Sequence, residues 1–205
     1  MAINWRESLD VETTAVLCME MQLGVLAADG PFSQLANAVE RRHVVVNGHK
    51  LLMAARARGV KVVHCTAAFR SDRLGTPINT PLVASLLKNE RHMLEGTPAI
   101  DVIPEWRDAR DIESRRYHGL SPFTATNLDN QLRVMNINTV IVMGVSLNLG
   151  VLGLCIEAAN LGYCVVVVAD AVAGFPEDYA KAVLTNTLSL VATPFLADEV
   201  IGYWS

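Results

Sequence analysis

The sequence has few charged residues. Only 19% of its 205 residues are Asp, Glu, Lys or Arg and 51% are hydrophobic, whereas an average soluble domain carries about 25% charged residues. Disordered chains combine low hydrophobicity with high charge, so that class is excluded. With only 13 glycines and 8 prolines, collagen-like and low-complexity chains are excluded too. A net charge of −4 provides no broad basic face, and we expect no nucleic-acid partner.

Charge is absent altogether between Arg133 and Glu157. A membrane span needs about 20 predominantly apolar residues, but polar residues such as Asn136 and Asn148 interrupt this stretch. We therefore expect no membrane span. Residues 1–14 carry charges where a signal peptide would have its apolar region, which favours a cytoplasmic location.

Motifs for disulfides, metals and nucleotides are also missing. The four cysteines lie in apolar runs and form no C-x-x-C pair, as is typical of buried free thiols. They are Cys18, Cys65, Cys155 and Cys164. No Asp/His cluster has the spacing of metal ligands, and no glycine pattern matches a dinucleotide site or a P-loop. We expect neither a metal nor a cofactor, and a small molecule as the substrate.

Short apolar runs alternate with segments of helical periodicity along most of the chain. Strands are expected over residues 14–20, 60–65, 111–114, 139–143, 163–169 and 191–195. Helices are expected over residues 33–58, 83–87, 127–135, 149–161 and 177–190. This alternation predicts a single α/β domain over residues 1–205, with a three-layer α/β/α arrangement and an open, mostly parallel, Rossmann-like six-stranded sheet. We expect the irregular segment 67–122 to cross the active edge of that sheet.

Ligands of open α/β sheets bind beyond the carboxyl ends of the strands. Glu20 ends the first apolar strand as a lone carboxylate, which favours a functional role. Asp170 follows the fifth strand and is more typical of a cap. His64 lies within a buried strand and is expected to be a hydrogen-bonded core histidine, whereas His92 is expected on a helix surface or in a loop.

Several segments together resemble the isochorismatase-like, or cysteine hydrolase, superfamily. They occur in the family's order from Thr14 to about Phe195. The segments are Met19–Gln22, Ser121–Phe123 with Thr126–Leu128, Val140–Val145, and Ala158–Tyr163 followed by Val165–Ala171. The resemblance implies a hydrolase with the α/β fold expected above.

The resemblance also implies where catalytic groups lie. Amide hydrolases of this family use an aspartate after strand one, a lysine before the middle aromatic motif and a cysteine after strand four. These positions correspond here to Glu20, to the neighbourhood of Tyr117 and to Gly150. A glycine offers no nucleophile, and isochorismatases also carry glycine there. The resemblance therefore implies vinyl-ether hydrolysis of a small carboxylated metabolite without covalent catalysis.

In this interpretation Glu20 is the general acid/base. Arg116 or His118 orients it or holds a substrate carboxylate. Backbone amides near a Val145–Ser146 peptide bond, which is often cis in the family, bind developing negative charge. The residues expected to bind substrate or oxyanion are Gln22, Phe123, Val145, Ser146, Leu149 and Gly150.

Two other functions stay open. One is a catalytically inactive family member that binds a ligand or serves as an oligomeric structural protein. The other is an amidohydrolase with a relocated cysteine, Cys65 or Cys18. The apolar excess, together with Val200–Trp204 at the C-terminus, predicts that more surface is buried between subunits of a homodimer or homotetramer, as is common in the family.

Overall fold

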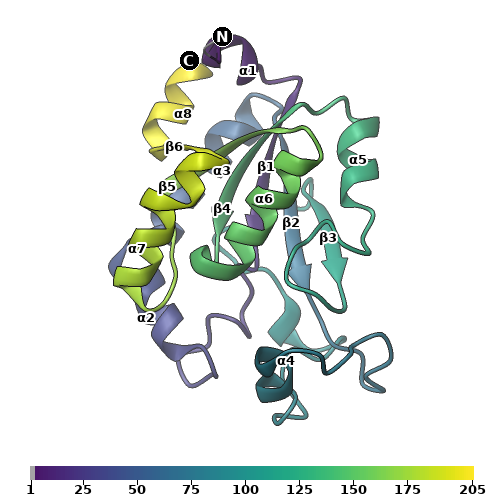
Figure 1. The fold of residues 1–205 in the computed structure, drawn as a ribbon. Helices are drawn as coiled ribbons and strands as arrows, with labels where there is room; N and C mark the ends of the chain where they lie inside the picture. The colour runs from purple at the N-terminus through teal and green to yellow at the C-terminus, as the bar shows by residue number, and fades with distance from the viewer. Residues whose placement is uncertain (1–2) are drawn as a thin grey trace.

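A six-stranded parallel sheet lies at the centre of the computed structural model, which describes residues 3–205 (Figure 1). The strands are β1 Thr14–Met19, β2 Lys61–Ala67, β3 Ile112–Arg116, β4 Thr139–Gly144, β5 Cys164–Val172 and β6 Thr193–Phe195. Their order is β3-β2-β1-β4-β5-β6, and every neighbouring pair is parallel. The predicted fold class is confirmed. β2 and β3 lie on one side of β1, whereas β4, β5 and β6 lie on the other, so the strand order reverses at β1.

Helices cover both faces of the sheet, with α3 behind it and α6 in front of it in Figure 1. The helices are α1 Trp5–Ser8, α2 Ser33–Arg41, α3 Val44–Ala57, α4 Pro81–Leu86, α5 Leu128–Val134, α6 Leu152–Asn160, α7 Glu177–Asn186 and α8 Ala197–Tyr203. A π-helical turn, Leu147–Val151, leads into α6. Because both faces are covered, β1 and β4 are buried at every position, which explains their continuous apolar runs.

The expected helix over residues 33–58 is in fact two helices, and that prediction was wrong. The chain turns at His43, which has a left-handed φ of 54°. At this turn Arg42 donates hydrogen bonds to Ala169 O at 2.8 Å and to Val172 O at 3.0 Å, near the end of β5. The apolar repeat continues through both helices, so the sequence pattern gives no sign of the break.

The C-terminal segment packs within its own chain. Val200 and Trp204 of α8 are buried, and the Trp204 indole donates a hydrogen bond to Leu9 O at 3.0 Å. These two residues are therefore covered within their own chain, whereas Tyr203, in the same segment, is 37% exposed. The homo-oligomer stays a prediction.

Two polar residues have the structural roles predicted for them. Asp170 Oδ1 accepts a hydrogen bond from the Ala197 N–H at the first residue of α8, at 2.9 Å. His64 is buried and its Nε2 lies 2.8 Å from Asp111 Oδ2. None of the helices within residues 3–205 combines the length and apolar character needed to cross a membrane.

Gly144 is the last residue of β4 and lies against Met19, the last residue of β1. Its φ is +108°, and a Cβ there would collide with the backbone oxygen of Met19. Gly59 also has a left-handed φ, +77°, but a Cβ there would meet nothing within 4 Å. Substitution of alanine for each of these two glycines therefore distinguishes the cost of a steric collision from the cost of backbone strain alone.

We predict that Gly144→Ala lowers the free energy of unfolding by about 2–5 kcal/mol, because strain and overpacking add. Gly59→Ala should cost only about 1–2 kcal/mol, since strain acts alone. Urea denaturation of both variants measures the difference. Equal losses would show that β1 and β4 are not in the close register described.

Candidate active site

The carboxyl edge of the sheet opens onto a cavity of about 440 Å³. This volume is typical of small-molecule sites. Residues that follow β1, β2, β3 and β4 all contribute to its wall, among them Glu20, Ala68, Tyr117 and Ser146. A cavity thus lies beyond the strand ends, where the sequence predicts the site.

Glu20 reaches the cavity because the chain turns sharply after β1. Its φ is 48°, an uncommon value for a residue with a side chain. The turn is held by two backbone hydrogen bonds, from Glu20 N–H to Cys65 O at 3.0 Å and from Gln22 N–H to Glu20 O at 2.8 Å. The carboxylate is 20% exposed, so it lies at the cavity wall and not in bulk solvent.

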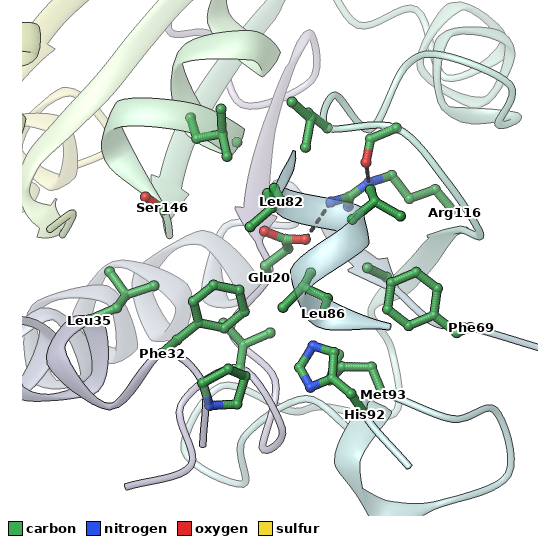
Figure 2. Close-up of a pocket in the computed structure, with 18 of the residues that line it drawn as sticks. Glu20, Phe32, Leu35, Phe69, Leu82, Leu86, His92, Met93, Arg116 and Ser146 are labelled. Atoms are coloured by element: carbon green, nitrogen blue, oxygen red, sulfur yellow. Dashed lines mark hydrogen bonds and ion pairs between the residues drawn. The ribbon is translucent and has the colours of Figure 1, made fainter. Parts of the chain in front are cut away.

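Arg116, the last residue of β3, pairs with Glu20 (Figure 2). Its Nη2 donates to Glu20 Oε1, and its Nε donates to Gly119 O at 3.2 Å. The guanidinium is only 5% exposed, yet Nη1 has no hydrogen-bond partner among the described residues. Buried polar atoms are nearly always paired, so Nη1 is an unsatisfied donor. The atom has almost no accessible surface, so a ligand in the cavity can accept from it only after the Arg116 side chain shifts.

Gly150 lies close to the second oxygen of Glu20. A Cβ at position 150 would lie 3.4 Å from Glu20 Oε2 and 2.8 Å from the Met19 side chain. The π-helical turn therefore packs tightly against Met19 and Glu20, and a glycine fits there without a steric collision.

The rest of the cavity wall is mostly apolar. Phe32, Leu35 and Phe69 line it together with Leu82, Leu86 and Met93 (Figure 2). Leu82 and Leu86 come from α4, which lies apart from the sheet in Figure 1. The irregular segment 67–122 thus forms much of the wall, as predicted, and the cavity suits a substrate with an apolar body and an anionic group.

Four more of the predicted site residues also line the cavity. They are His118, Ser146, Leu149 and Gly150. The Val145–Ser146 peptide bond is cis, as the resemblance implies. The Leu149 N–H already donates to Ser146 O at 3.1 Å, so its expected role as an oxyanion donor is not available in this conformation.

Three predicted substrate-binding residues do not line the cavity, and these predictions are corrected here. Gln22 is fully buried, and its side chain bonds Ala67 N–H, Ala67 O and Ile100 O at 2.7–2.9 Å. It therefore joins the loop after β1 to the end of β2. Phe123 stacks on Tyr163 with ring centroids 6.0 Å apart, and Val145 is completely buried.

His92 also lines the cavity; it lies in a turn, in keeping with the predicted helix surface or loop, but its side chain is buried. It is 6% exposed and has aromatic neighbours on two sides, Phe32 and Phe69, each with a ring centroid 6.0 Å away. Phe32 and Phe69 lie far from His92 in the sequence, so the local sequence around His92 does not indicate that it is buried.

The four cysteines do not line the cavity. Burial raises the pKa of the Cys65 and Cys155 thiols to about 12, and the pKa of Cys18 is raised well above its usual range for the same main reason. All three are therefore neutral thiols at physiological pH, and a thiol is a poor nucleophile. The placement of Cys18 and Cys65 argues against the relocated-cysteine alternative.

Among residues 3–205, no group of three or more His, Cys, Asp or Glu side chains is arranged to hold a metal ion.

Comparison with known proteins places the chain in a family. The family profile described as "Isochorismatase domain" matches residues 14–199. The chain belongs to this family. It is an isochorismatase-family hydrolase by sequence, and the expectation drawn from its motifs is confirmed at that level.

Relatives support the same assignment. The chain is 26% identical over 179 residues to the uncharacterized isochorismatase family protein YwoC of Bacillus subtilis strain 168, covering 86% of each. A cysteine hydrolase from Pseudomonas syringae pv. phaseolicola has the same fold, with a TM-score of 0.82, 24% identity and coverage of 96% and 94% of the two chains. The N-carbamoylsarcosine amidase of Thermoplasma acidophilum is 25% identical, with a TM-score of 0.72 and coverage of 91% and 97%.

We predict that iodoacetamide at pH 8 leaves Cys18, Cys65 and Cys155 of the folded protein unmodified, because the thiols are buried and protonated. Cys164 is half-buried, and should react slowly. Mass spectrometry of tryptic peptides measures each site, and the same reaction in urea, where all four should be modified, is the control. Rapid modification of Cys65 in the folded protein would restore the cysteine mechanism.

Proposed function

We propose that the protein hydrolyses a small carboxylated enol ether by general acid/base catalysis from Glu20, without a cysteine nucleophile. One observation carries the proposal. A buried guanidinium, Arg116, holds Glu20 at the cavity wall and has one N–H group left without a partner. An arginine in this state recognises a second acceptor, and a carboxylate is the acceptor that fits its planar geometry best.

Substrate binding comes first in the proposed reaction. The substrate carboxylate accepts a hydrogen bond from Arg116 Nη1, and its apolar body lies against the wall that includes Phe32 and Leu86. Its negative charge then lies next to Glu20. In the proposed reaction one proton is taken up from solvent when the substrate binds, and it is placed on Glu20 Oε2, the oxygen that does not pair with Arg116.

The chemical step then needs no covalent enzyme intermediate. Glu20 donates its proton to the terminal alkene carbon, and the ether becomes an oxocarbenium ion. Water adds to the cationic carbon and returns a proton to Glu20, and the hemiketal collapses to an alcohol and a keto acid. The balance is R–O–C(=CH2)–COO− + H2O → R–OH + CH3–CO–COO−. Both proton transfers use Oε2, the carboxylate oxygen that does not pair with Arg116.

Two alternatives predict different behaviour. An amidohydrolase, the activity named for the Thermoplasma acidophilum relative, would need a thiolate near the cavity, whereas none of the four cysteines lines it and three of them are buried. A binding protein without activity is favoured by the Glu20–Arg116 ion pair, which occupies one oxygen of the carboxylate. The pair lies in the wall of an accessible cavity, and this position supports the enzyme.

We predict that the purified protein releases pyruvate from isochorismate or a related enolpyruvyl ether. Glu20→Gln should lower kcat by about 10²- to 10⁴-fold, because an amide cannot donate the proton. Glu113→Gln is the matched control, since Glu113 also pairs with an arginine, Arg115, but outside the cavity. Equal turnover by Glu20→Gln and wild type, or no turnover by wild type with any of these ethers, would contradict the proposal.

Arg116→Lys should raise KM by about 10- to 100-fold, because lysine keeps the charge but loses the free Nη1 and the planar geometry. The same assay of pyruvate release measures it. Arg115→Lys changes an arginine on the same strand that lies outside the cavity, and its KM should equal that of wild type. A normal KM for Arg116→Lys would show that the substrate carboxylate binds elsewhere.

A further inference from the structure

His92 is a buried polar side chain without a hydrogen-bond partner in the fold. Its exposure, 6%, is close to that of His64, which is 5% exposed. His64 bonds Asp111 at 2.8 Å, as a core histidine does. No hydrogen bond joins the His92 ring to any of the described residues, and its ring lines the cavity.

The ring points into the cavity. In Figure 2 the imidazole lies in the space bounded by Phe32, Leu86 and Phe69, away from the Glu20–Arg116 pair. Its two aromatic neighbours, each with a ring centroid 6.0 Å away, form contacts along its sides and leave its nitrogens without polar contacts. The free hydrogen-bonding capacity of His92 is thus directed at whatever occupies the cavity.

The imidazole is neutral at physiological pH. Burial lowers the pKa of His92 below its usual value, and the positive charge of Arg73 lowers it further. The guanidinium of Arg73 lies 5.3 Å from the ring centroid of Phe69, one of the two aromatic neighbours of His92. A neutral imidazole has one N–H donor and one nitrogen acceptor, which suits a hydroxyl group better than a second carboxylate.

We infer that His92 is a specificity residue that hydrogen-bonds a hydroxyl group on the substrate body, at a position in the cavity away from the carboxylate held by Arg116. The substrate class is then a hydroxylated, apolar ring or chain with one carboxylate beyond its ether oxygen. This inference rests on the proposed function for the placement of the carboxylate. A histidine needed only for packing would require no free nitrogen, because phenylalanine fills the same volume.

A binding experiment with unreactive probes tests this role. The probes are phenoxyacetate, which has an apolar ring and a carboxylate, and its 2-, 3- and 4-hydroxy derivatives. Isothermal titration calorimetry measures their Kd for wild type, His92→Phe and His92→Gln. At least one hydroxy derivative should bind wild type about 3- to 10-fold more tightly than phenoxyacetate, the gain expected from one net hydrogen bond.

His92→Phe should remove this preference and change the Kd of phenoxyacetate less than about 2-fold, because the packing is preserved. His92→Gln should keep part of the preference, since an amide also donates and accepts. A hydroxyl preference that survives in His92→Phe, or no preference in wild type, would overturn the inference. The probes cannot be hydrolysed as enol ethers, so a failure of turnover would contradict the proposed function without affecting this result.

Discussion

The ion pair between Glu20 and Arg116 is the interaction on which the site depends. β3 is not a neighbour of β1 in the sheet, so the arginine at the end of β3 reaches past the end of β2 to meet the carboxylate that follows β1. Burying a guanidinium is costly unless its donors are paired. Glu20 and Gly119 satisfy two of its nitrogens and leave Nη1 free. The fold therefore keeps an unpaired donor behind the cavity wall, and a shift of the Arg116 side chain would present it to a ligand.

The surrounding structure holds this pair in place. Parallel strands bring Glu20 and Arg116 to one edge of the sheet, and the left-handed turn at Glu20 directs the side chain out of the strand. Gln22 supports the turn from behind through its bonds to Ala67 and Ile100. Close contact between Gly144 and Met19 brings the π-helical turn with Gly150 up to the carboxylate. The irregular segments, such as residues 67–122, form much of the rest of the cavity wall.

The sequence predicted those parts of the structure that depend on residues close to one another along the chain. A strand buried on both faces is a continuous apolar run, so β1, β4 and β5 could be found in this way, and Glu20 stands out as the charge that ends such a run. The edge strands β3 and β6 have no such run, and their predicted bounds match the structure less closely. Arg116 was found through a family resemblance. The break between α2 and α3 was missed, because it depends on bonds from Arg42 to the distant β5. For the same reason Gln22 was taken for a site residue and the burial of His92 was missed, since distant segments bury both.

A crystal structure of the complex with phenoxyacetate would test the central claim most directly. The account predicts one carboxylate oxygen of the ligand within hydrogen-bond distance of Arg116 Nη1, with the aromatic ring against Phe32 and Glu20 still paired to Nη2. A ligand carboxylate bound anywhere else in the cavity, with Nη1 still unpaired, would contradict it.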